Sequence, residues 1–155
     1  MIETAPSFSA VPTGVHDPAT APTMWGRWAN RAQVEVLGST RKTRRVVLLT
    51  NLVWTDIDGQ RHVVPEGRMS DGATIPFGVW WLMGGRLALD YIRAAFVHDF
   101  WCETRPPGSS SHEAAVRFYN GLRADGMGYH QARWCFRGVV KFGPQWGAKP
   151  LLFNL

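Results

Sequence analysis

The chain has 155 residues, a formal net charge of +5 and hydrophobic residues at 45% of its positions. This length suits one domain, and this share of hydrophobic residues can form an ordinary core, which excludes a fully disordered chain. No apolar stretch approaches about 18 residues, so no membrane-spanning helix is expected. The first residues lack the basic and apolar segments of a signal peptide, so synthesis in the cytoplasm is expected.

The positive charge permits attraction to nucleic acid, anionic lipid or acidic polymers. Cations cluster along the sequence at Arg41, Lys42, Arg44 and Arg45, which form either a solvated turn or a phosphate-binding patch. Basic and aromatic residues do not alternate along a recognisable binding module, so no specific recognition of nucleic acid is expected.

The two cysteines, Cys102 and Cys135, are far apart in the sequence and lie among apolar residues. Two cysteines do not make a disulfide framework, so we expect buried free thiols. A zinc site is not expected either, because no spacing in the sequence matches a zinc motif and the two cysteines are far apart.

Residues 1–24 are rich in proline, serine, threonine and alanine and show no amphipathic period. This composition predicts an extended N-terminal arm that becomes ordered only on its own domain or on a neighbouring subunit. Residues 25–155 are then one domain.

Strand patterns follow the arm. Residues 33–37 alternate apolar and polar side chains, and residues 44–54 are rich in valine, leucine and threonine. Asp58 and Gly59 form a tight-turn pair, after which Val63 and Val64 continue the apolar pattern. The first half is therefore predicted to be one small antiparallel sheet, a meander.

Helix patterns occupy the second half. Pro76 suits the first turn of a short helix, and residues 87–103 carry apolar side chains at helical spacing. Ser110 and Glu113 form a capping-box pattern at the start of the next helix, and residues 129–142 make the last one. Strands first and helices after predict the α+β class, with a short helix and three longer packed helices.

His98 and Asp99 are the sharpest anomaly, because they lie in an otherwise apolar helix. A histidine oriented by a second group can act as a general base, and a carboxylate can bind a divalent cation such as calcium. Asp71 and the carbonyl groups around Gly72 could supply further metal ligands. The alternative is structural: Asp99 binds the loop that begins at Ser70, and the pair only clamps this loop to the helix.

Two further groups belong to the candidate site. His112 and Glu113 start the following helix, and a helical hairpin would bring them near His98 as assisting groups. Ser70, Gly72, Ile75 and Pro76 are predicted to shape the structural loop between sheet and helix, within residues 70–76.

Taken in order, these motifs resemble the phage and prophage proteins of domain-of-unknown-function family 1353. The resemblance covers roughly residues 46–146. Its motifs are, in order, residues 64–67 (VPEG), 70–76 (SDGATIP), 94–101 (AAFVHDFW) and 142–147 (FGPQWG). Each segment alone is a weak signal, but their combination is specific. The resemblance implies a protein made in a bacterial cytoplasm and associated with a phage particle.

The sequence departs from the family pattern at two places. Ala115 stands where the family carries an aspartate, with Ser111 near the position of its arginine. Cys102 stands where tyrosine is usual after the His-Asp pair. The family's aspartate at the position of Ala115 could orient the histidine, so its absence removes one group that could orient His98.

Two functions follow as hypotheses. The first is a virion-associated structural or accessory protein of the tail, baseplate or head-to-tail region, whose arm docks on other phage structural proteins in a homo- or hetero-oligomer. The second is a calcium-assisted hydrolase of envelope lipid or cell wall with His98 as base. Secreted phospholipases A2 offer an analogy of arrangement for it: they also place His-Asp on one helix, near a glycine loop that binds calcium.

Overall fold

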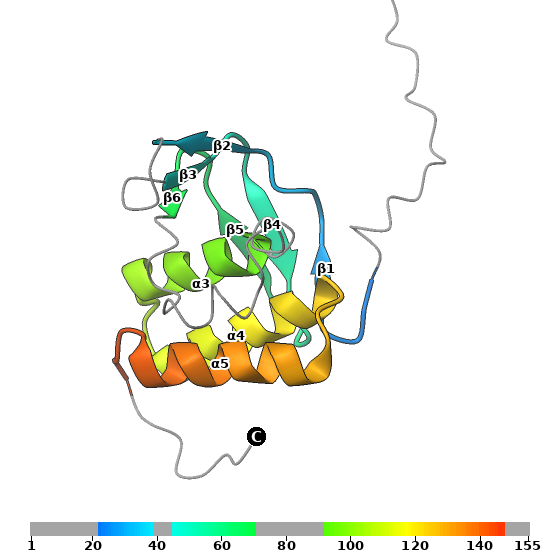
Figure 1. Ribbon diagram of the computed structural model, residues 1–155, viewed down its shortest axis with the longest axis vertical. Coiled ribbons are helices and arrows are strands. Elements are labelled where there is room, and N and C mark those ends of the chain that lie inside the picture. The colour runs from blue at the N-terminus through cyan, green and yellow to red at the C-terminus, as the bar shows by residue number, and fades with distance from the viewer. Residues whose placement is uncertain (1–21, 39–44, 71–91, 148–155) are drawn as a thin grey trace, which may run out of the picture.

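The computed structural model describes residues 22–38, 45–70 and 92–147. Strands come first and helices after, and the strands pack on one side of the helical layer (Figure 1). This arrangement confirms the predicted α+β class. Most of the predicted arm and the short helix predicted after Pro76 lie outside the described residues.

Within the described residues, six short strands form two antiparallel sheets of three strands each. One sheet has the order β1-β4-β5 and the other has the order β2-β3-β6. Each contains one hairpin of consecutive strands and a third strand from elsewhere in the chain, so the single meander that the sequence predicted is divided in two. The bounds are β1 (Arg27–Trp28), β2 (Val34–Leu37), β3 (Arg45–Leu48), β4 (Leu52–Thr55), β5 (Arg61–Val64) and β6 (Met69–Ser70).

The strand predicted over residues 44–54 is wrong as one element, because the chain bends between β3 and β4 and changes sheet. Asn30 holds this bend: its side-chain nitrogen donates to the Asn51 carbonyl at 2.7 Å, and its oxygen accepts from the Val53 amide at 3.1 Å. The Asn51 side chain in turn accepts from the Glu66 amide at 2.9 Å. Apolar content predicted a continuous strand, whereas polar side chains distant in sequence end it.

Three helices lie in the last described segment, residues 92–147: α3 (Ile92–Thr104), α4 (Ser111–Ala124) and α5 (Tyr129–Phe142). The first residues of the helix predicted over residues 87–103 lie outside the described part of the chain. Ser110 and Glu113 form the predicted capping box, and α5 has the predicted bounds. None of these described helices combines the length and the apolar character that crossing a bilayer requires.

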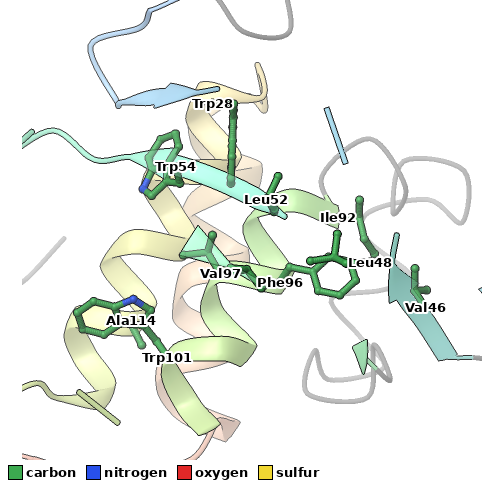
Figure 2. Packing of buried hydrophobic residues seen from close by; sticks show 11 residues of the cluster. Trp28, Val46, Leu48, Leu52, Trp54, Ile92, Phe96, Val97, Trp101 and Ala114 are labelled. Atoms are coloured by element: carbon green, nitrogen blue, oxygen red, sulfur yellow. The ribbon is translucent and has the colours of Figure 1, made fainter. Parts of the chain in front are cut away.

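The apolar core has two parts, one on each side of α3. On the sheet side, Trp28, Trp54 and Leu52 pack against Phe96 and Val97 of α3 (Figure 2). On the other side, α3 contributes Ala94 and Ala95 to a cluster completed by Ala115, Phe118, Leu122, Met127, Ala132, Cys135, Phe136 and Val139. Because both sides of α3 are covered, its buried polar residues must find partners inside the domain.

Gly121 sets how closely α4 approaches α3. A Cβ atom added at this glycine would lie 2.9 Å from the Cβ of Ala94 and 3.2 Å from the Trp28 ring. Only a residue without a side chain fits there, so the helix that carries His98 is held directly against α4.

Candidate functional site

His98 lies inside the helical layer on α3. It is only 4% exposed, and its ring centroid lies 5.4 Å from that of Phe118 on α4. Its Nδ1 atom is 3.4 Å from Oδ1 of Asp99, which is longer than an ordinary N–H···O bond. The ring is therefore packed as a core side chain, and its contact with Asp99 is weak.

Asp99 joins the helix to the second sheet. The Ser70 hydroxyl donates a hydrogen bond to Oδ2 of Asp99 at 2.6 Å. Ser70 is in β6 and is buried, whereas Asp99 is half-buried on α3. A hydroxyl that donates to a carboxylate makes a strong charge-assisted bond, so this contact fixes β6 to α3.

Cys102 lies one helical turn after His98, and its sulfur approaches the imidazole. The Sγ atom is 3.5 Å from Nε2 and 3.8 Å from Nδ1 of His98. Because the two nitrogens point in different directions, two similar distances place the sulfur over the ring face and away from both lone pairs. The imidazole is thus badly aligned to remove the thiol proton.

The pKa of Cys102 also indicates that this thiol is not activated. Burial raises the pKa of this thiol to about 12, the Asp99 carboxylate adds to the rise, and the Arg105 guanidinium opposes it. The thiolate is the reactive form of cysteine, so at neutral pH this group is a poor nucleophile. Cys135 is also a free thiol, and burial raises its pKa to about 11.

His112 and Glu113 make separate contacts at the start of α4. Glu113 accepts from the Ser110 amide at 2.8 Å, which completes the capping box, and the His112 ring meets Phe136 of α5 edge-on at 5.7 Å. Among the described contacts, none joins either residue to His98 or Asp99. His98 faces Phe118 instead, which lies five residues beyond Glu113, or about 7 Å farther along the helix axis.

The proposed metal ligands are only partly within the described residues. Asp71, Gly72, Ile75 and Pro76 lie outside them, so the calcium loop predicted there is not described. No group of three or more His, Cys, Asp or Glu side chains among the described residues could hold a metal ion. Calcium takes about 6–8 oxygen ligands, and Asp99 with the Ser70 hydroxyl does not supply such a set.

A second polar cluster, which the sequence analysis missed, lies on the sheet side of α3. His62 Nε2 is 2.9 Å from Oδ2 of Asp56, and both side chains are buried. Oδ1 of Asp56 accepts from the amides of Asp58 and Gln60, each at 3.0 Å. The carboxylate thus closes the β4–β5 turn and fixes the imidazole at the same time.

Arg117 and Trp101 complete this cluster from the helices. The Arg117 guanidinium lies 3.9 Å above the Trp101 ring, and its Nε atom is 3.7 Å from Oδ2 of Asp56. The His62 ring meets Trp101 edge-on at 5.5 Å. Along β5, His62 and Val64 are buried and their neighbours are exposed. The two-residue spacing of His62 from Val64 was the sequence signal that could have placed His62 on the inward face of the strand.

The described site is therefore that of an α+β domain whose central helix carries a His-Asp pair bonded to a strand. A family model described as "Protein of unknown function (DUF1353)" matches residues 46–139. The chain belongs to this family, as the resemblance of its motifs implied.

Two curated relatives come from Sinorhizobium fredii (strain NBRC 101917 / NGR234), and both are uncharacterized. The protein y4jT is 32% identical over 107 residues, which cover 69% of this chain and 31% of the relative. The protein y4iH is 30% identical over 101 residues, covering 65% and 41% respectively. The chain thus spans about a third of the length of the first of these relatives and two fifths of the second. No solved structure matches it significantly.

Proposed function

We propose that this protein is a structural or accessory component of a phage or prophage particle, in the tail, baseplate or head-to-tail region. The observation that carries the proposal is an apolar patch on the outer face of the β2-β3-β6 sheet, formed by Leu37, Val47, Leu49 and Met69, with Glu35 and Arg45 beside it on the same face. Leu37, Leu49 and Met69 are 40%, 50% and 55% exposed. Contiguous exposed apolar side chains mark surfaces that bind another protein.

Strand register supports a common orientation for these residues. Val47 pairs with Glu35 on one side and with Met69 on the other. Paired residues in antiparallel strands point to the same face, and the buried Val46 and Leu48 point to the opposite one. The outer face is thus distinct from the core.

The edge of this sheet offers a second means of association. β2 is at one end of the strand order, and three of its four residues are exposed. An edge strand presents backbone donors and acceptors that can pair with another chain. We propose that neighbouring subunits associate here and through the arm over residues 1–24, in a homo- or hetero-oligomer.

The geometry around His98 favours this proposal over a hydrolase. A general base must reach the proton that it removes, and His98 is covered by its own domain. Ala115, at the position of the family's aspartate, is buried in the apolar cluster between the helices. The contact between Asp99 and Ser70 is what a clamp between helix and sheet requires.

Quantitative mass spectrometry of particles from the strain that carries the gene tests the proposal. We expect a fixed copy number per particle, and loss of incorporation in the double variant Leu37→Lys, Met69→Lys. The matched control, Ile57→Lys with Val63→Lys, places the same charges at exposed apolar positions of the β4–β5 hairpin and should incorporate normally. Particles that lack the unmodified protein would refute an assembly role.

Deleting residues 1–24 tests the arm separately. The truncated domain should keep its helical circular dichroism, because the described core begins after the arm, yet enter particles poorly. Normal incorporation of the truncated chain would contradict the role of the arm while leaving the role of the sheet patch open to its own test.

The competing hydrolase has its own assay. Purified protein with calcium should release no fatty acid from phospholipid vesicles and no fragments from peptidoglycan. Turnover that disappears in His98→Gln, with the fold retained, would replace the structural proposal with a catalytic one.

A further inference from the structure

The outward face of α5 carries a stripe of cations around one exposed tryptophan. Arg133, Arg137 and Lys141 follow one another at four-residue intervals, with Trp134 beside them, and α5 contains no acidic residue. Trp134 is 60% exposed, which is unusual for so large an apolar ring. α5 lies on the side of the helical layer away from the sheets (Figure 1).

This stripe contains a shallow hollow of about 180 Å³. Its walls are His130, Arg133, Trp134 and Arg137. The Arg133 side chain is held in place, since its Nη1 atom donates to the Tyr129 hydroxyl at 3.1 Å. The hollow is therefore lined by residues that carry guanidinium, imidazole and indole groups.

These groups suit a phosphate beside a planar ring. Guanidinium groups bind phosphate oxygens through paired hydrogen bonds, and an exposed aromatic ring stacks on a nucleobase. Four helical residues advance the chain by about 6 Å, so the three cations form a row about 12 Å long. A row of this kind fits a polyanion with repeated charges better than one isolated phosphate.

We propose that α5 binds single-stranded nucleic acid without sequence preference, with the backbone along the cations and a base on Trp134. This binding is independent of the assembly role proposed above. Anionic lipid fits less well because the apolar side of α5, including Ala132, Phe136 and Val139, is already buried against the core. An interfacial helix must instead insert such a side between the lipids.

Fluorescence anisotropy with the full chain and a labelled oligothymidylate tests the proposal. We expect saturable binding that weakens with salt, with a slope of about −0.7 per phosphate contact. Trp134→Ala should weaken binding about tenfold, because loss of one stacked base costs that much, and Trp134→Phe should recover most of it. All these positions lie on the surface, so circular dichroism should remain unchanged.

Charge reversal on α5 and on the strands tests whether the cations of α5 bind the nucleic acid or whether the net positive charge of the protein attracts it. The double variant Arg137→Glu, Lys141→Glu should weaken binding strongly, and the residual binding should show a salt slope smaller in magnitude by about 1.4. The control Arg27→Glu, Arg61→Glu changes the net charge equally on exposed strand positions and should retain most of the binding. Equal losses in both pairs, an unchanged affinity in Trp134→Ala, or binding only to anionic vesicles would overturn the proposal.

Competition by an unlabelled nucleotide tests whether the ligand is a nucleic-acid strand or a single nucleotide. If the site binds a strand, thymidine monophosphate should compete far more weakly than the oligomer. Its single phosphate can contact only part of the row of Arg133, Arg137 and Lys141. Equally strong competition by the monophosphate would contradict a strand site and leave a single nucleotide as the ligand.

Discussion

The described residues contain two His-Asp pairs, one on α3 and one in the β4–β5 hairpin. The pair that stands out in the sequence makes the weaker contact, and the pair that does not stand out makes the stronger one. His98 and Asp99 are adjacent in sequence, yet their closest polar atoms are 3.4 Å apart. His62 and Asp56 are six residues apart, yet they form a buried contact at 2.9 Å. Adjacent residues on a helix point in different directions, whereas a hairpin turn can bring separated residues face to face.

The two pairs also differ in how completely their carboxylates are satisfied. Asp56 accepts from two backbone amides and faces His62 and Arg117, all inside the domain. Asp99 accepts from Ser70 and remains half-buried. We therefore predict that the stability of the fold depends more on the pair of His62 and Asp56 than on the pair of His98 and Asp99.

The largest effect is expected for Asp56→Ala. This change removes the acceptor of two backbone amides and leaves His62 and Arg117 without their carboxylate, which should cost about 3–5 kcal/mol of unfolding free energy. Urea denaturation followed by circular dichroism measures it. Asp58→Ala, at the exposed tip of the same turn, serves as the control and should cost little. A loss below about 1 kcal/mol in Asp56→Ala would reverse the ranking of the two pairs.

Matched substitutions at the two histidines should have the next largest effect. His62→Leu leaves the buried Asp56 oxygen without its partner and should cost about 2–3 kcal/mol. His98→Leu keeps an apolar side chain of similar size against Phe118 and should cost less than about 1.5 kcal/mol. Equal losses in urea denaturation would mean that His98 is held by polar contacts as firmly as His62.

A smaller effect is expected for the link between Asp99 and Ser70. The double-mutant cycle of Asp99→Ala and Ser70→Ala should give a coupling of about 1 kcal/mol, because the carboxylate is partly open to solvent. A coupling near zero would mean that β6 is held to α3 by apolar packing alone.

The smallest effect concerns the reactivity of Cys102. Its native pKa of about 12 lies above the ordinary value of 9.0, so the folded state holds the proton more tightly. Below pH 9 the thiolate fraction should be lower than in the unfolded chain by roughly two to three orders of magnitude. Stability should therefore be insensitive to this group below pH 9 and fall as pH rises from 9 towards 12.

Alkylation by iodoacetamide across this pH range, followed by peptide mass spectrometry, measures the reactivity of Cys102. Cys102→Ser identifies the contribution of Cys135. Rapid labelling of native Cys102 at pH 7 would show that the thiol is activated, and would return the His98 region to consideration as a catalytic site.

The sequence by itself determined the elements whose signals are local. The capping box of Ser110 and Glu113 and the bounds of α5 follow from side chains within a few residues of one another. The turn at Asp58 and Gly59 is equally local, since Gly59 adopts a positive φ of 79° that suits glycine. The order of strands before helices was sufficient for the α+β class.

Only the tertiary structure decided how the polar groups are used. Asn30 ends a strand from 21 residues away, and Arg117 of α4 reaches Asp56 in a strand turn. The pairing of His98 with Phe118 and of Asp99 with Ser70 likewise depends on how α3 lies between the sheet and α4. A linear pattern records which groups are present, but distances between elements are set by packing, so it could not separate a clamp from a catalytic pair.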